Sequence, residues 1–258
     1  MRERIAEALS TIELDDHVRV LLAVESGSRA WGFPSQDSDW DVRFIYAQHP
    51  DWYLSVQARR DVLEYPISDA LDVSGWDLRK ALQLMAKSNP PLLEWLRSPI
   101  VYLEATSAAD QMRALSSSCF NPRSCMYHYL HMAEGNFREY LRRGTVPLKK
   151  YFYVLRPVLA CKWIQQDGTM PPMEFQSLVE SQLPEHVRPA VLSLLERKRA
   201  GDELEEGPRV PEINEFLEDS LATLRDELAA LSRSEKPDWD SLDQLFRDVL
   251  GEAWRAAG

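Results

Sequence analysis

Residues 18–46 read VRVLLAVESGSRAWGFPSQDSDWDVRFIY, and two short apolar runs within them decide the expected fold. The runs 18–24 and 42–46 are rich in β-branched and aromatic residues, and turn residues flank them. Each run therefore predicts a buried strand. The stretch between them, GSRAWGFPSQDSD, is rich in Gly, Pro, Ser and Asp and predicts a connecting loop.

Two carboxylates stand at the entry to the second predicted strand. Side chains at positions i and i+2 of a strand point to the same face, so Asp39 and Asp41 should project together. Their mutual repulsion is removed by a divalent cation, and hard oxygen ligands suit Mg²⁺. A pair of such ions stabilises the attacking and leaving oxygens in phosphoryl and nucleotidyl transfer. The alternative is a solvated turn of the kind expected for Ser35, Asp37 and Ser38.

A Gly-Ser pair follows the first predicted strand. Gly27 permits close approach of the backbone, where free N–H groups can cradle a triphosphate, and the hydroxyl of Ser28 adds a donor. Arg29 is placed to neutralise phosphate charge. An apolar strand, Gly-Ser, a loop and then Asp-x-Asp leading into a second strand form a far more specific pattern than any of these parts alone.

This pattern resembles the motif of the polymerase-β-type nucleotidyltransferase superfamily. The strings GSRAWGFPSQDSDWDVRFIY, GWDLRKAL, SNPPLLEWLRSPIVY and KKYFYVLRPVLA are similar to one branch of it, the predicted nucleotidyltransferases associated with RNA-repair gene clusters. The similarity covers most of residues 20–165. It implies a polymerase-β-like fold and an enzyme that uses a nucleoside triphosphate and two Mg²⁺ ions.

Enzymes of that superfamily carry a third carboxylate on a neighbouring strand, and three residues of this chain are candidates. Asp72 lies between Leu71 and Val73, an alternation that turns its carboxylate toward the same face as the pair. Asp77 has a competing structural role, because Ser74 to Asp77 matches a capping box at the start of a helix. Asp69 falls in a predicted turn. We expect Asp72 to be the third ligand.

The rest of the chain predicts an α+β fold in two domains: a small mixed-sheet nucleotidyltransferase domain at 1–105 and an all-helical domain at 106–258. In the first, we expect helices at 2–13, after Asp77 and from the N-cap Asn89, with a further pair of strands at 52–56 and 62–67. In the second, the acidic stretch GDELEEGP at 201–208 predicts a mobile link between helices. Amphipathic patterns predict the helices of this domain at 125–143, 149–166, 171–183, 189–200, 213–231 and 241–254.

Positive charge gathers in one segment of the predicted helical domain. Eight Lys and Arg residues stand against two Glu in this segment; they are Arg123, Arg138, Arg142, Arg143, Lys149, Lys150, Arg156 and Lys162. On one helix, Lys149, Tyr153 and Arg156 share a face. Lys149 or Lys150 can hold phosphates, Tyr153 can stack on a base, and Arg156 can bind phosphate or orient a carboxylate. The alternative for the two lysines is a solvated helix start.

Composition sets limits on the partners and the cellular compartment. A formal net charge of −11 argues against a protein that coats nucleic acid through bulk electrostatics, so any such contact is local. Three cysteines without metal-ligand spacing indicate neither a disulfide framework nor a zinc site. The charged N-terminal sequence lacks the pattern of a signal peptide, and no stretch predicts a membrane span. We expect a cytoplasmic protein, and the sequence favours no oligomeric state.

These observations predict a metal-dependent, ATP-binding nucleotidyltransferase that transfers a nucleoside monophosphate to an acceptor hydroxyl and releases pyrophosphate. Arg138, Arg142 and Arg143 favour a polyanionic acceptor, so we expect an RNA 3′ end. One alternative is a module without catalysis that senses nucleotide or binds a partner. Another is a transferase that acts on a small molecule or on a protein hydroxyl.

Overall fold

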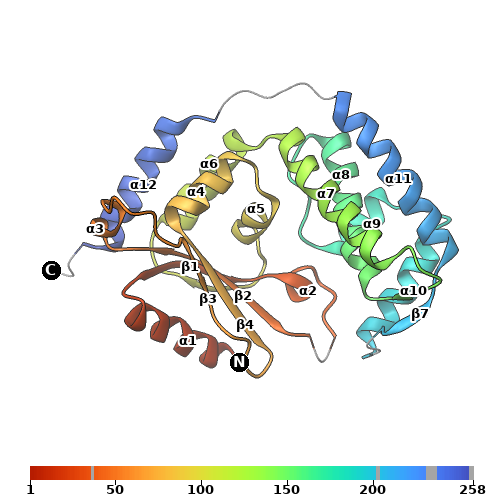
Figure 1. The fold of residues 1–258 in the computed structure, drawn as a ribbon, viewed down its shortest axis with the longest axis horizontal. Helices are drawn as coiled ribbons and strands as arrows, with labels where there is room; N and C mark the ends of the chain where they lie inside the picture. The colour runs from red at the N-terminus through yellow and green to blue at the C-terminus, as the bar shows by residue number, and fades with distance from the viewer. Residues whose placement is uncertain (36–37, 202–203, 231–236, 256–258) are drawn as a thin grey trace. The chain divides into compact units, whose positions relative to one another are not determined.

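The two apolar runs form neighbouring antiparallel strands in a five-stranded mixed sheet, as seen in a computed structural model of the chain (Figure 1). The structure describes residues 1–35, 38–201, 204–230 and 237–255. Asp37, expected in a turn, lies outside them. The chain forms two compact units. We call residues 1–30, 39–120 and 236–258 the sheet unit, and residues 31–38 and 121–235 the helical unit.

The sheet has the order β3-β4-β2-β1-β5, and its strands are β1 (Arg19–Glu25), β2 (Trp40–Ala47), β3 (Val62–Glu64), β4 (Leu71–Asp77) and β5 (Val101–Glu104). Only β2 and β4 run parallel among these five strands; the other neighbours are antiparallel. β1 is buried along almost its whole length, as its continuous apolar sequence predicts for a central strand. The mixed sheet of the expected fold is confirmed.

Helices cover both faces of the sheet (Figure 1). Ile5, Leu9 and Ile12 of α1 pack against one face in a core that includes Phe44 and Val73. α4 packs against β2 and β4, and α6 packs against β1. The helices of the sheet unit are α1 (Arg2–Asp15), α2 (Gly27–Ala30), α3 (Pro50–Tyr53), α4 (Leu78–Ala86), α5 (Pro90–Leu96), α6 (Ala108–Cys119) and α12 (Trp239–Ala253).

Two helix starts test the capping predictions in this unit. Asn89 is the N-cap of α5, and its side chain accepts a hydrogen bond from the Leu92 N–H, as expected. The prediction of a capping box from Ser74 to Asp77 is wrong. Ser74 lies within β4, because parallel pairing with β2 keeps the chain extended as far as Asp77. Asp77 itself caps α4 by accepting from the Arg79 N–H at 2.9 Å.

The helical unit contains the helices predicted along this part of the sequence: α7 (Pro122–Tyr140), α8 (Lys150–Asp167), α9 (Phe175–Gln182), α10 (Arg188–Arg199) and α11 (Pro211–Ala230). It also contains a two-stranded ribbon of β6 (Thr145–Pro147) and β7 (Glu206–Pro208). The prediction of a mobile link at 201–208 is therefore wrong for Glu206–Pro208, because this end of the stretch pairs with β6. Residues 202 and 203 lie outside the described parts.

Two further expectations concern segment boundaries. The strand expected at 52–56 is wrong, because Pro50–Tyr53 forms α3. α6 and α12 contact α4, so both helices belong to the sheet unit by their contacts. The domain boundary expected after residue 105 stays a prediction. Among the described residues, no helix is long and apolar enough to cross a membrane.

Candidate functional site

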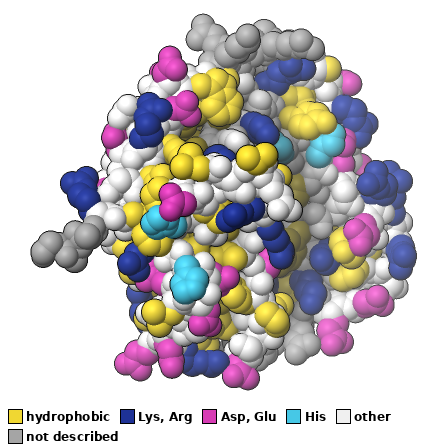
Figure 2. Space-filling view, turned by 60° about the vertical axis from the view of Figure 1, so that its left-hand side comes forward, with side chains coloured by type: hydrophobic (Ala, Val, Ile, Leu, Met, Phe, Trp, Pro, Cys, Tyr) yellow, Lys and Arg dark blue, Asp and Glu magenta, His cyan; other side chains and the backbone are white. Residues whose placement is uncertain are grey.

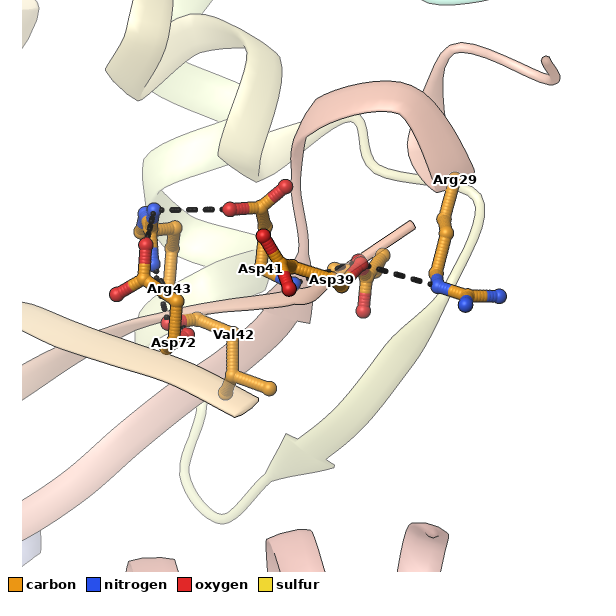
Figure 3. Close-up of polar contacts among 7 residues, drawn as sticks. Arg29, Asp39, Asp41, Val42, Arg43 and Asp72 are labelled. Atoms are coloured by element: carbon orange, nitrogen blue, oxygen red, sulfur yellow. Dashed lines mark hydrogen bonds and ion pairs between the residues drawn. The ribbon is translucent and has the colours of Figure 1, made fainter. Parts of the chain in front are cut away.

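The parallel register of β2 and β4 places two of the predicted carboxylates side by side. Asp41 pairs with Asp72, and Arg43 pairs with Ser74 two residues further along. Because residues that are in register on neighbouring strands point to the same face, the Asp41 and Asp72 side chains share one face of the sheet (Figure 3). Each of these two side chains retains 28% of its exposure to solvent. Both are thus accessible to a small ligand.

Arg43 lies between the two carboxylates (Figure 3). Its Nη2 is 2.7 Å from Oδ2 of Asp72 and 3.2 Å from Oδ1 of Asp41. Its Nη1 donates to the backbone carbonyls of Val42 and Asp72, both at 3.1 Å. The guanidinium therefore joins one carboxylate oxygen from each strand and is itself held by the backbone of both.

Gly27 lies directly against the Asp41 carboxylate. A Cβ at this position would fall 2.1 Å from Oδ2 of Asp41, and Gly27 has a φ of +62°, which disfavours any side chain. The Ser26 N–H donates to the Asp41 carbonyl at 2.8 Å, which fixes this approach. Ser28, the next residue, lies in α2 and is buried. The structure thus brings Gly27 against the Asp41 carboxylate, and the binding of phosphate by Gly27 and Ser28 stays a prediction.

Burial and repulsion both act on Asp41. Burial raises the pKa of Asp41, and the negative charges of Asp72 and Asp39 raise it further, whereas Arg43 and Arg29 lower it. Arg29 also donates from Nε to the Asp39 carbonyl at 3.1 Å, and its guanidinium lies 3.9 Å from the centre of the Trp40 ring. Asp39 and Arg29 therefore both act electrostatically on Asp41.

Glu25 is a site residue that the sequence analysis missed. Its side chain is fully buried, and its Oε1 accepts a hydrogen bond from the Asp41 N–H at 2.9 Å. The Tyr102 hydroxyl donates a hydrogen bond to Oε2 of Glu25. Burial raises the pKa of Glu25, while the bonds from Tyr102 and Asp41 lower it. No signal in the sequence points to this role of Glu25, because a charged residue at the end of a strand is usually exposed. The role depends on contacts with β5, which is distant in the sequence.

The other two candidates for the third carboxylate have structural partners elsewhere. Asp77 is fully buried, caps α4 and accepts a hydrogen bond from the Tyr53 hydroxyl at 2.7 Å. Asp69 lies in an exposed turn and pairs with Arg4 at 3.1 Å. The structure thus brings only Asp72 of these three beside Asp41. Its role as a ligand stays a prediction.

The predicted phosphate-binding and base-binding residues belong to the helical unit. Lys149 is exposed next to the start of α8, and Nζ of Lys150 lies 5.2 Å from the centre of the Tyr153 ring. Tyr153 meets Trp31 edge to face at 5.9 Å. Arg156 is only 4% exposed, and its guanidinium lies 4.5 Å from the centre of the Trp31 ring. Tyr153 and Arg156 thus flank one indole.

Lys198 of α10 is a second residue that sequence reasoning missed. It is 8% exposed, and its Nζ lies 4.9 Å from the centre of the Phe33 ring and 5.6 Å from that of Phe152. Burial lowers the pKa of Lys198, and the charge of Lys149 lowers it further. Its sequence context, ERKRA, is typical of a solvated helix end, so the pattern did not single it out.

The carboxylates supply the oxygen ligands that Mg²⁺ prefers. In the described parts of the chain, however, no three His, Cys, Asp or Glu side chains already lie together as a ready ligand set. Arg43 contacts one oxygen of Asp41 and one of Asp72. The donor chemistry of these carboxylates fits a divalent cation, and metal binding by them stays a prediction.

The close approach of Gly27 to Asp41 predicts the effect of a substitution. We expect Gly27→Ala to cost more than Gly32→Ala by about 1–3 kcal/mol of unfolding free energy, because the added methyl group must displace the Asp41 carboxylate. Gly32 is the matched control: its φ is +83°, but a Cβ there would meet nothing within 4 Å. Denaturant unfolding measures both costs. Equal costs, with Asp41 unmoved in a crystal structure of the variant, would contradict this reading.

The buried Glu25 predicts a pH-dependent difference in stability. Because the pKa of Glu25 in the folded state lies above its ordinary value of 4.5, the protonated form favours folding, and that contribution is lost as the pH rises through the folded-state pKa. Glu25→Gln removes this loss. The unfolding free energy of the variant relative to wild type should therefore increase between about pH 4 and pH 7.

Tyr102→Phe provides the second arm of this measurement. It removes a hydrogen bond that lowers the pKa of Glu25, so the stability of this variant should fall more steeply with rising pH than that of wild type. Denaturant unfolding at each pH measures both effects. A Glu25→Gln difference that stays flat over the range would show that Glu25 ionises equally well in the folded and unfolded chains.

Comparison with known proteins gives a family match across most of the chain. The profile of the RlaP family, described as RNA repair pathway DNA polymerase beta family, matches residues 1–248. An uncharacterized protein of Bacillus subtilis (strain 168), YcgL, is 48% identical over 259 residues, which cover 100% of each chain.

A solved structure was also matched, at a low level of similarity. It is a nucleotidyltransferase-like protein from Exiguobacterium sibiricum 255-15, with a TM-score of 0.30 and 13% identity; the match covers 99% of this chain and 81% of that one. The family match and the 48% identical relative are the stronger findings. The chain belongs to the RNA repair pathway branch of the DNA polymerase β family.

Proposed function

We propose that this chain transfers a nucleoside monophosphate from a nucleoside triphosphate such as ATP to the hydroxyl of an RNA 3′ end, and that it needs Mg²⁺ to do so. The position of Asp41 carries the proposal. Its carboxylate lies in register with Asp72, against Gly27 and within the electrostatic influence of Asp39. Clustered carboxylates beside a close backbone approach are the elements that metal-dependent nucleotidyl transfer requires.

In this proposal, Asp39, Asp41 and Asp72 hold two Mg²⁺ ions. When bound, these ions supply charge stabilisation to the attacking and leaving oxygens. The acceptor oxygen forms a bond to the α-phosphorus, and the bond from that phosphorus to the bridging oxygen breaks, which releases pyrophosphate. Asp72 accepts the proton of the acceptor hydroxyl. Glu25 holds the Asp41 backbone N–H, so it is a positioning residue.

We further propose phosphate-binding residues in each unit taken by itself. In the sheet unit these are Ser28 and Arg29, and in the helical unit they are Lys149 or Lys150. Burial and, to a smaller extent, the charge of Lys149 lower the pKa of Lys198, and a phosphate bound nearby would favour the charged form of this lysine. Tyr153 is proposed to stack on the base, and Arg156 to bind phosphate or to orient a carboxylate.

Exposed arginines support RNA as the acceptor. Arg138, Arg142 and Arg143 are all exposed near the end of α7. On the face seen in Figure 2, Lys and Arg side chains are interspersed with Asp and Glu. A local cluster of arginines on an acidic chain suits a short polyanionic segment.

The three cysteines are all buried and free, which supports a cytoplasmic location.

Substitution of Asp41 tests the proposed chemistry. With ATP, Mg²⁺ and a panel of RNA ends, Asp41→Asn should release pyrophosphate at least about a hundred-fold more slowly than wild type, because it removes a charged ligand of the reacting centre. Asp51→Asn is the matched control, since Asp51 lies in α3 with an 85% exposed side chain and should leave the rate unchanged. Equal rates in wild type and Asp41→Asn would refute the proposal. Nucleotide binding without any pyrophosphate release would indicate a nucleotide-sensing module instead.

A triple substitution tests the acceptor. Changing Arg138, Arg142 and Arg143 to Ala should weaken binding of single-stranded RNA and reduce the slope of log affinity against log salt by about 2, while ATP affinity stays unchanged.

A charge-matched triple in the sheet unit, Arg4, Arg60 and Arg247 to Ala, should leave RNA affinity near that of wild type. If the first triple binds RNA as tightly as wild type at low salt, the RNA assignment fails, and a small-molecule or protein hydroxyl becomes the acceptor to test.

A further inference from the structure

Arg43 lies within the carboxylate cluster, yet none of the roles assigned above involves it. It follows Asp41 by two residues on β2, so the alternation of the strand turns both side chains to one face. Its side chain is only 19% exposed. A cation at this position is unexpected in a site that is to receive divalent cations.

The guanidinium is fixed at both of its terminal nitrogens. Nη1 is bound to the backbone carbonyls of Val42 and Asp72, which belong to different strands. Nη2 reaches Oδ1 of Asp41 and Oδ2 of Asp72. The planar fork of an arginine is suited to such multiple contacts, and a lysine is not. Arg43 therefore holds the two carboxylates together while it occupies one oxygen of each.

The charge balance explains what this contact achieves. Without Arg43, the Asp41 and Asp72 carboxylates would repel each other, and Nη2 of Arg43 lies 3.2 Å from the first and 2.7 Å from the second. A divalent cation that binds the same carboxylates meets the positive charge of Arg43 at short range, which weakens its binding. A triphosphate brings negative charge of its own, so a cation that arrives with nucleotide suffers less from this repulsion.

We propose that Arg43 is a positioning residue and built-in counter-cation that competes with the divalent metal for Asp41 and Asp72, so that metal loads well only together with nucleotide. This inference rests on the proposed function, because it concerns the metal that the carboxylates are proposed to hold. It assigns to the site a coupling between metal binding and nucleotide binding. The coupling is set by one side chain.

Binding of Mn²⁺ to the full chain without nucleotide tests the proposal. Arg43→Met should bind free Mn²⁺ at least about ten-fold more tightly than wild type, because the competing charge is gone. With a nonhydrolysable triphosphate present, the advantage of the variant should shrink to about three-fold or less. Arg43→Lys keeps the charge and should stay within about three-fold of wild type in both measurements. The electron paramagnetic resonance signal of unbound Mn²⁺, followed during a titration, gives the affinity of each protein.

Arg60→Met is the matched control, because it removes the same charge from an exposed ion pair with Glu64 in the same unit. It should bind Mn²⁺ as wild type does. A thermal melt adds an independent readout: metal-free Arg43→Met should melt below wild type, and Mn²⁺ should raise its melting temperature more than that of wild type. If Arg43→Met does not fold, Arg43→Gln keeps a donor for the backbone carbonyls and carries the same expectations.

The outcomes separate this inference from the proposed function. If Arg43→Met and wild type bind free Mn²⁺ equally, or if the variant binds more weakly, the competition does not exist and the inference is overturned while the metal site stands. Asp41→Asn shows whether any bound Mn²⁺ uses the proposed site. If this substitution does not reduce Mn²⁺ binding, with or without nucleotide, the proposed metal site fails and this inference fails with it.

Discussion

The parallel pairing of β2 with β4 is the constraint on which the candidate site depends. It sets Asp41 opposite Asp72, so two negative charges on separate strands meet on one face of the sheet. A slip of one residue would turn Asp72 to the opposite face, which is packed against α1. The fold thus accepts an electrostatic cost at this point, and Arg43 offsets part of it. Such a cost persists only where the surrounding structure fixes the register.

Several contacts fix that register from both ends of β4. Before the strand, Asp69 and Ala70 form a tight turn in which both have positive φ, and the Ala70 carbonyl accepts a hydrogen bond from the Trp40 N–H at 2.7 Å. Each such residue costs about 1 kcal/mol when it is not glycine. After the strand, Asp77 caps α4. The strained turn and the buried cap hold β4 in place relative to β2, which is why Asp72 arrives beside Asp41.

Local pattern singles out Asp41 and Gly27, because strand alternation is local and a glycine beside a strand end indicates a close approach. Asp39 lies one residue before β2, so the alternation of the strand does not fix the direction of its side chain, and its role stays a prediction. Glu25 and Lys198 could not be predicted, since their roles arise from burial against distant segments, Tyr102 for the first and Phe33 for the second. The capping box failed for the same reason, because pairing with β2 overrode a local signal.

Connectivity adds a link between the two units that no motif spacing shows. Residues 31–38 belong to the helical unit, although they join Ala30 to Asp39 of the sheet unit. Phe33 is buried against Phe152 and Phe175, with ring centres 5.1 Å and 5.2 Å apart, and it anchors this segment. Arg29 lies two residues before the anchored segment, and Asp39 directly follows it. The loop between Gly-Ser and Asp-x-Asp therefore also supplies a buried aromatic ring to the core of the helical unit.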